Sequence, residues 1–188
     1  MCLLAACAGC AAAPGNDRFA PLGTWCGSAE FRGARLDLSV RFYREGAALR
    51  AAMSSPDLLL LDQPLDGVQS AGPHVRFVTP DEHPLQFDGV VDGDSLRGTA
   101  AIPAVPGVAG AGRAAPALRF ALGRDTAPAA PPYLTREVRF GSGAVVLAGT
   151  LFAPIPGPGR HAGIVILQGS STNLRREYRF YADHFARA

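Results

Sequence analysis

The stretch IVILQGSSTNLRREY, residues 164–178, contains the residues whose types and order come closest to an enzyme active site. An aliphatic run breaks at Gly169, Ser170 and Ser171, and a helical pattern follows. Many α/β enzymes begin an active site with a strand, a turn of small residues and a helix in this order. The nucleophile is absent, because G-x-S-x-G occurs nowhere in the 188 residues and Ser170 has no identifiable base beside it. The sequence therefore predicts part of an active site and no catalytic residue.

No other group of residues predicts a cofactor or a metal. Cys7 and Cys10 have the C-x-x-C spacing of redox and zinc sites, but they lie in an Ala-rich leader without a second pair. His74, Asp81 and His83 fit no standard metal-site spacing. The 18 basic residues are all arginines and are spread along the chain, so we expect no nucleic-acid partner.

Residues 1–17 have the composition of a lipoprotein signal remnant or, alternatively, of an unstructured Ala-rich leader. Leu4-Ala5-Ala6-Cys7 has the form of a bacterial lipobox, in which the cysteine is lipidated and becomes the mature N-terminus. The charged and most of the apolar parts of a signal peptide are missing, so we expect the true start to lie upstream. Cys7 is the favoured lipidation site and Cys10 the second, which leaves Cys26 without a disulfide partner.

This leader predicts a periplasmic or outer-membrane lipoprotein, or a secreted bacterial protein. No other stretch approaches the ~18 apolar residues of a transmembrane helix. We therefore expect contact with a membrane only through a lipid anchor.

Residues 18–124 have the pattern of an antiparallel β domain. In RLDLSVRFYR, residues 35–44, apolar and polar residues alternate, which places one face on a core and the other in water. Asp92-Gly93 predicts a two-residue hairpin, because glycine readily takes the positive φ of a type I′ turn. About eight such strands close into a barrel or pack as a two-sheet sandwich. The eight runs are GTWCGSAEF, RLDLSVRFYR, ALRAAM, LLLLDQPL, HVRFV, LQFDGVV, SLRGTAAI and ALRFAL.

A Pro-rich linker, residues 125–132, separates this domain from a segment with a different pattern, residues 133–188. The segment begins with a predicted hairpin. Its first strand ends at Phe140, a Gly141-Ser142-Gly143 turn follows, and the second strand continues to Phe152.

After the hairpin the pattern predicts a strand and a helix. GIVILQG, residues 163–169, is uniformly apolar, as expected of a strand that is covered on both faces in a parallel sheet. The last residues have helical periodicity, with Tyr178, Tyr181, Ala182 and Phe185 on an apolar stripe. We expect Arg179, Asp183 and Arg187 on its solvent side.

Residues 133–188 resemble the opening of an α/β-hydrolase domain, in particular that of bacterial serine hydrolases of the dienelactone-hydrolase and S9-peptidase-like type. The matching positions are LAGTL at 147–151, Pro154, Gly169-Ser170, and Tyr181-Ala182 with Phe185-Ala186. The preceding β domain resembles the lipocalin-like module that often stands before such hydrolases, through GTWCGSAEF and FDGVVDGDSLRGT. The resemblance implies a mainly β chain in which a barrel or sandwich precedes the first strands and helix of an α/β-hydrolase sheet.

In that family the turn after the third strand supplies one backbone N–H of the oxyanion hole. Carried over by position, Gly169 allows the turn and Ser170 or Ser171 contributes the N–H. Many relatives have histidine where this chain has Gln168, which alters the supporting hydrogen bonds. The acid and histidine of the triad follow the nucleophile in this fold, so the resemblance implies that they are missing as well.

The sequence thus predicts the N-terminal fragment of a secreted serine hydrolase acting on ester, thioester or peptide-like acyl bonds. The full-length parent would take a small-molecule acyl substrate, and this chain alone would be inactive. The 133–188 segment is too short to sustain a core, and its helix ends in ARA without a capping glycine, which indicates a chain cut short. The alternative is a lipid-anchored β-barrel lipoprotein that binds an apolar ligand or a protein partner.

Overall fold

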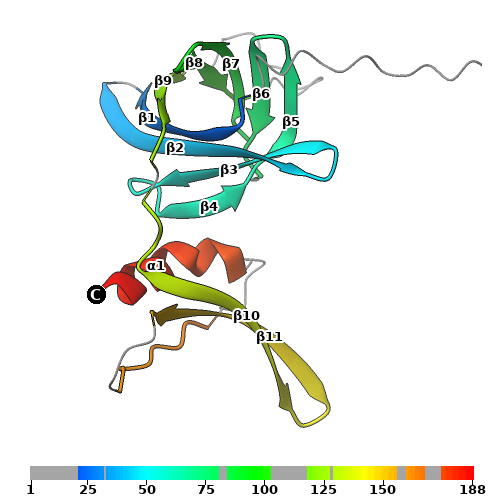
Figure 1. The fold of residues 1–188 in the computed structure, drawn as a ribbon, viewed down its shortest axis with the longest axis vertical. Helices are drawn as coiled ribbons and strands as arrows, with labels where there is room; N and C mark the ends of the chain where they lie inside the picture. Colours follow the sequence, from blue (N-terminus) through cyan, green and yellow to red (C-terminus); the bar gives the residue numbers. More distant parts are fainter. Residues whose placement is uncertain are drawn as a thin grey trace, which may run out of the picture.

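The computed structural model describes residues 21–31, 33–80, 84–102, 118–127, 129–155, 160–167 and 175–188 of the chain (Figure 1). Nine strands form one sheet and two further strands form a separate hairpin. The strands are β1 (Gly23–Phe31), β2 (Ala34–Glu45), β3 (Ala48–Ser55), β4 (Leu60–Pro64), β5 (Asp66–Ala71), β6 (His74–Val78), β7 (Gln86–Asp92), β8 (Ser95–Ala101), β9 (Leu118–Asp125), β10 (Tyr133–Ser142) and β11 (Val145–Pro154). A 3₁₀ turn, η2 (Arg175–Tyr178), leads into the helix α1 (Arg179–Arg187). The chain is mainly β, as the sequence predicts.

The nine-stranded sheet curls into a nearly closed up-and-down barrel. Its order is β4-β3-β2-β1-β9-β8-β7-β6-β5, and neighbouring strands are antiparallel. The edge strands β4 and β5 are consecutive in the chain and are separated by Leu65 alone. Leu65 is buried, and its backbone N–H donates to the Ala51 carbonyl at 2.9 Å. The chain therefore passes directly from one edge of the sheet to the other, which brings the two edges together at Leu65. The predicted antiparallel β domain is confirmed, and of the two arrangements expected, barrel or sandwich, the sheet forms a nearly closed barrel.

Aromatic side chains fill the interior of the barrel. Phe77 is stacked on Phe87 with ring centroids 4.7 Å apart, and Phe42 meets Phe77 edge-on at 5.7 Å. Phe120 lies 5.5 Å from Phe87, and Trp25 is fully buried with its indole N–H donating to the Pro21 carbonyl. In β2 the buried residues alternate with outward ones, which explains why the period-two pattern folds this way. These side chains belong to one cluster of buried residues, which forms the packed core of the barrel.

Two glycines allow the strands to bend tightly enough for closure. A Cβ on Gly98 would lie 2.0 Å from the backbone oxygen of Asp88 on the neighbouring strand. A Cβ on Gly27 would lie 2.2 Å from the backbone oxygen of Ala121. No larger residue fits at either position without moving a strand, so these glycines mark corners of the barrel.

The structure contains one barrel strand more than the eight that the sequence predicts. The additional strand is β5, which has no buried residue and therefore lacks the alternation that identifies a strand. The predicted run LLLLDQPL starts too early, because Leu58 and Leu59 lie in a turn and Leu59 has a φ of 55°. The predicted β7–β8 hairpin exists, but its central residues are Gly93 and Asp94. Of these two residues only Gly93 has a positive φ, as in a type II′ turn, whereas the type I′ turn expected has a positive φ at both.

After the barrel the chain forms the predicted hairpin, followed by η2 and α1 (Figure 1). The turn lies at 143–144, two residues later than expected, because pairing continues to Ser142 and Val145. The helix lies between the hairpin and the barrel, where the Arg179 guanidinium is 3.9 Å from the Asp62 carboxylate of β4. Asp62 also accepts a hydrogen bond from Arg41 at 3.1 Å. One carboxylate thus links two barrel strands to the helix.

The predicted buried strand covers residues 163–169, of which the structure describes 163–167. These five residues do not form a strand. Residues 160–167 have no regular secondary structure, and Val165 and Leu167 are 82% and 79% exposed. A parallel strand needs partners along both edges and cover on both faces. The part of the chain that the structure describes supplies neither partner nor cover to this run.

The helix α1 presents a different face to its neighbours than the sequence predicts. Tyr181 and Phe185, expected to be buried, are 43% and 48% exposed. Asp183, expected in solvent, has a side chain only 14% exposed and faces the hairpin. The reason is that the hairpin offers Tyr133 as a hydrogen-bond partner and ring contacts for arginines, so the polar face of the helix packs inward.

Candidate functional site

The predicted oxyanion-hole residues Gly169, Ser170 and Ser171 lie outside the described residues, as does the lipidation candidate Cys7. Their roles therefore remain predictions. On the N-terminal side of the turn, the described chain ends in the exposed run 160–167. On the C-terminal side it resumes at Arg175.

An ion pair holds the beginning of η2 on the hairpin. Arg175 donates from Nη2 to Oε2 of Glu137 on β10 at 2.7 Å. The other oxygen of Glu137 accepts a hydrogen bond from Thr150 of β11, also at 2.7 Å. The bonds from Thr150 and then Arg175 lower the pKa of Glu137, so the carboxylate is ionised at neutral pH and is not a proton donor. This arrangement places Arg175, where the described chain resumes, on the hairpin.

A second cluster joins the first residue of the hairpin to the helix. The Tyr133 hydroxyl donates to Oδ1 of Asp183, and the Arg187 Nε–H lies 2.9 Å from both oxygens of that carboxylate. The Arg187 guanidinium also lies over the Tyr133 ring, 5.6 Å from its centroid. Burial and then the Asp183 carboxylate raise the pKa of Tyr133 to about 12. Burial alone would raise the pKa of Asp183, but the bonds from Arg187 and Tyr133 outweigh it and lower that pKa.

These pKa shifts determine what the cluster can do chemically. A phenol with a pKa of about 12 stays protonated at neutral pH, so Tyr133 is neither a nucleophile nor a general base there. The ionised Asp183 accepts hydrogen bonds and does not donate a proton. The cluster is a structural joint between strand and helix.

The thiol of Cys26 is not activated. It lies on the outer face of β1 and donates weakly to Oδ2 of Asp125 at 3.8 Å. Desolvation and then the Asp125 charge raise its pKa above the ordinary value, which lowers the thiolate fraction.

The potential metal ligands of the described residues do not gather into a cluster. No three histidine, cysteine, aspartate or glutamate residues among those described are placed to hold a metal ion, and Asp81 and His83 lie outside that set. None of the helices that are described is long and apolar enough to cross a bilayer.

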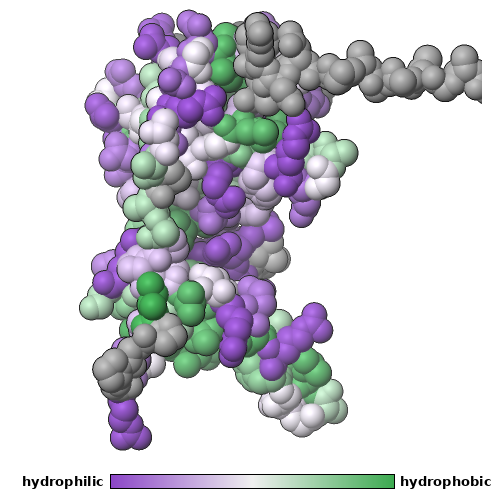
Figure 2. All heavy atoms as spheres, in the orientation of Figure 1, coloured by the Kyte–Doolittle hydropathy of each residue, from purple (hydrophilic) through white to green (hydrophobic). Residues whose placement is uncertain are grey.

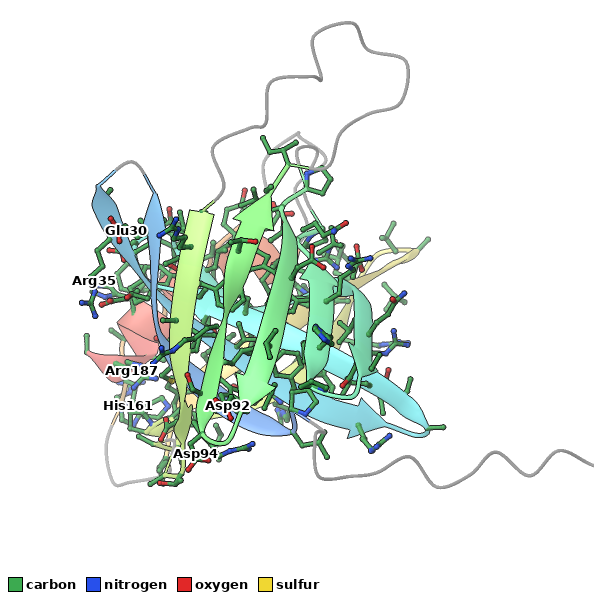
Figure 3. All side chains as sticks on the ribbon, turned by 90° about the horizontal axis from the view of Figure 1, so that it is seen from above. Glu30, Arg35, Asp92, Asp94, His161 and Arg187 are labelled. Atoms are coloured by element: carbon green, nitrogen blue, oxygen red, sulfur yellow. The ribbon has the colours of Figure 1, made fainter. Side chains whose placement is uncertain are left out.

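The barrel has a groove of about 450 Å³ on its outer face, across β5, β6, β7 and β8. Two rows of side chains line it, as the strand register shows. One row runs Ala71, His74, Val90, Arg97, and the other runs Gln69, Arg76, Asp88, Thr99. Figure 3 shows these four strands side by side in green and teal, with Asp92 and Asp94 at the end where β7 turns into β8.

Sequence reasoning missed both the Tyr133 joint and this groove. The spacing of Asp183 and Arg187 is visible in the sequence, but it indicates an exposed helix pair and not a partner on a distant strand. The groove had one usable signal. In β7 the buried residues are Phe87, Gly89 and Val91. Val90 is therefore an apolar residue on the outer face of the strand, where the alternating pattern predicts a polar one.

Comparison of the chain with models of protein families, with curated proteins and with solved structures found no match. A functional assignment therefore has to be argued from the residues and their placement.

Proposed function

We propose that residues 133–188 are the first strands and helix of an α/β-hydrolase domain, which follows the barrel in a secreted serine hydrolase. The enzyme would cleave ester, thioester or peptide-like acyl bonds of small-molecule substrates. Support comes from the order of the elements, a hairpin, an apolar run, a small-residue turn and a helix, and from the resemblance of these residues to that family.

The observation that carries the proposal is that large apolar side chains are far more exposed after the barrel than on the barrel strands. On the described barrel strands Val90 is the only large apolar residue that is exposed. After the barrel, exposed apolar residues occur on both strands, along the extended run and on the helix, and Figure 2 shows green patches on this lower part. These residues are Leu134, Phe140, Val145, Val146, Leu147, Leu151, Ile155, Ile164, Val165, Ile166, Leu167, Tyr181 and Phe185.

Exposed apolar surface of this extent indicates a face that other protein covers. The run 163–167 is too apolar for a surface loop, and its composition is that of a strand in the middle of a parallel sheet. In our proposal, further strands of the same hydrolase sheet pair with this run, and further helices cover Tyr181 and Phe185.

In the proposed enzyme the turn at 169–171 contributes a backbone N–H to the oxyanion hole, from Ser170 or Ser171. The Arg175–Glu137 pair attaches the residue at which the described chain resumes to β10, and this supports a fixed exit from the turn in the proposed enzyme. The nucleophile, the acid and the histidine would come from sequence that follows residue 188, so chain 1–188 alone should not turn over substrate.

Hydrolysis of p-nitrophenyl acetate and butyrate tests this division of roles. Chain 1–188 should be inactive, and a chain extended by the sequence encoded after codon 188 should be active. The Ser170→Ala variant tests whether that side chain is a nucleophile, with Ser142→Ala in the hairpin as the matched control. Turnover by chain 1–188 that is lost in Ser170→Ala and retained in Ser142→Ala would overturn the proposal.

We further propose that Cys7 carries a lipid that anchors the protein to a bacterial membrane from the periplasmic side. The support is the lipobox form of residues 4–7 and the small-residue composition around it. Metabolic labelling with an alkyne fatty acid tests the proposal in a bacterial host that expresses the chain behind a complete lipoprotein signal. Label should appear in the wild type and in Cys10→Ser, and should be absent in Cys7→Ser. Equal labelling of the Cys7→Ser variant would contradict it.

A further inference from the structure

The end of the β10–β11 hairpin, residues 139–148, projects from the molecule and is called the hairpin tip below. Every residue of the tip is exposed. The hairpin meets η2 and α1 through its other half, where Glu137 pairs with Arg175 and Tyr133 bonds to Asp183. Figure 1 shows the yellow end of the hairpin extending away from the helix and the barrel, and Figure 2 shows green spheres at this end. The helix therefore leaves the tip uncovered.

Both faces of the tip carry exposed apolar side chains. The register pairs Phe140 with Leu147, and because side chains alternate along a strand, Val145 lies on the same face. The opposite face carries Val146, which is paired with Gly141 and is 70% exposed. A further layer of protein covers one face of a sheet and would leave the other in water. A lipid surface surrounds a projecting tip and covers both faces.

The charge of the tip favours an anionic lipid surface. Arg139 is the one charged residue in the sequence from 139 to 148, and β11 carries no charge. The acid nearest in sequence is Glu137, which is paired with Arg175 at 2.7 Å. An arginine beside apolar residues lays its methylene stem on the apolar surface and keeps its guanidinium at the level of the lipid phosphates.

The length of the hairpin sets how deeply the tip can enter. From Glu137 to Ser142 at the turn, the strand rises about 17 Å, at ~3.4 Å per residue. Interfacial segments are buried by about 5–10 Å, so the tip can enter the interface while η2 and α1 stay in water. Deeper entry is unfavourable, because the outer edges of a two-stranded hairpin need solvent for their backbone groups.

We propose that the hairpin tip inserts into the interfacial layer of a membrane that contains anionic phospholipid, with Arg139 at the phosphates. The proposal does not rest on the hydrolase function, in which other protein pairs with the run 163–167 and covers Tyr181 and Phe185. It does not require a lipid on Cys7 either. The test therefore uses the full chain with Cys7→Ser, so that no anchor contributes to binding.

Tryptophan fluorescence with lipid vesicles shows whether the tip itself enters the lipid. The chain has one tryptophan, Trp25, which is fully buried in the barrel, so Phe140→Trp adds an exposed reporter at the tip. With vesicles of about 30% phosphatidylglycerol in phosphatidylcholine, its emission should shift to shorter wavelength and be quenched by brominated acyl chains. Val90→Trp places the same reporter on the outer face of the barrel and should show neither effect.

Co-sedimentation with the same vesicles measures the two parts of the interaction. Val146→Asp should weaken binding by at least about 10-fold, because the burial of a valine is lost and a charge is added. Val90→Asp on the barrel is the matched control and should leave binding unchanged. Arg139→Gln should weaken binding to the anionic vesicles by about fivefold and leave binding to pure phosphatidylcholine unchanged. Arg119→Gln, at an exposed position of β9, should change neither.

Three results would overturn the proposal. The first is emission of Phe140→Trp that neither shifts nor is quenched with lipid up to about 5 mM, well above the concentration at which a single acyl chain binds. The second is equal quenching of Val90→Trp. The third is unchanged vesicle binding by Val146→Asp together with loss of self-association in gel filtration, which would assign the tip to a second copy of the chain. Native emission of Trp25 in the variants without an added tryptophan will show that the barrel is folded.

Discussion

Replacing Tyr133 by phenylalanine should release helix α1 from the hairpin without disturbing the barrel. Tyr133 is only 7% exposed, and its hydroxyl is the one group by which this side chain bonds to Asp183. The ring contacts with Phe152 and Arg187 remain in the variant, so the change removes the hydrogen bond and little else.

The usual strength of a hydrogen bond to a charged group gives the magnitude. Such a bond contributes about 1.5–3 kcal/mol to stability. Asp183 keeps its bond to Arg187, which reduces the loss. We expect the free energy that holds α1 in place to fall by about 2 kcal/mol, within the range for a hydrogen bond to a charged group.

Burial of the Tyr133 hydroxyl and then its bond to Asp183 raise the pKa of this group, and the shift predicts the pH dependence of helix docking. The folded chain binds the phenolic proton more tightly than the unfolded chain, because the pKa of Tyr133 is raised to about 12. The stabilisation is therefore complete below pH 10 and is lost as the pH rises from 10 towards about 12. For Asp183 the pKa is lowered from 3.8, so its contribution is present above that value and is lost as the pH falls below it.

Amide hydrogen exchange of α1, followed by mass spectrometry, measures this free energy locally. A loss of about 2 kcal/mol accelerates exchange about 30-fold, since 1.4 kcal/mol corresponds to tenfold. Tyr181→Phe is the control, because Tyr181 is on the same helix, is 43% exposed and loses the same hydroxyl. The proposed joint would be refuted if the amides of α1 exchange in Tyr133→Phe at a rate within about twofold of the wild type. It would also be refuted if Tyr181→Phe accelerates their exchange equally.

The remaining predictions concern the barrel and its thiol. Phe77→Ala should lower the free energy of unfolding of the barrel by about 4 kcal/mol, because Phe77 is fully buried. Phe140 is 53% exposed, so Phe140→Ala should change this free energy by less than about 1 kcal/mol. Urea titration measures both changes. In the same titration Gly98→Ala should lower the free energy of unfolding by at least about 2 kcal/mol, because the added Cβ meets a backbone oxygen. Gly141 has open space around it, so Gly141→Ala should change this free energy little. Cys26 should react with iodoacetamide at pH 7.5 more slowly than a free cysteine because its pKa is raised, and equal or faster labelling in peptide mass spectrometry would contradict this.

The sequence predicts the barrel well because alternation of polar and apolar residues is a local consequence of a sheet with one buried face. Eight of the nine strands of the barrel carry this signal or an apolar run. Strand β5 does not, since it has no buried residue and its place in the sheet depends on pairing with β6. A strand of this kind is determined by its neighbours and not by its own residues.

The helix shows a different limit of sequence reasoning. Its periodicity was sufficient to predict a helix near the observed bounds, but not which face packs inward. That choice depends on Tyr133, 50 residues earlier in the chain, which offers Asp183 a partner. The groove is likewise not predicted, because four strands whose register the sequence does not specify contribute to its lining, and only the exposed Val90 interrupts the alternating pattern.

The sequence of the genomic DNA beyond codon 188, translated in all three forward frames, tests most directly whether residues 133–188 begin a hydrolase. Our account predicts a frame that continues the α/β pattern and contains a G-x-S-x-G turn between a strand and a helix, followed by an acid and a histidine in that order. Translation that shows no such element in any frame would contradict the proposed enzyme.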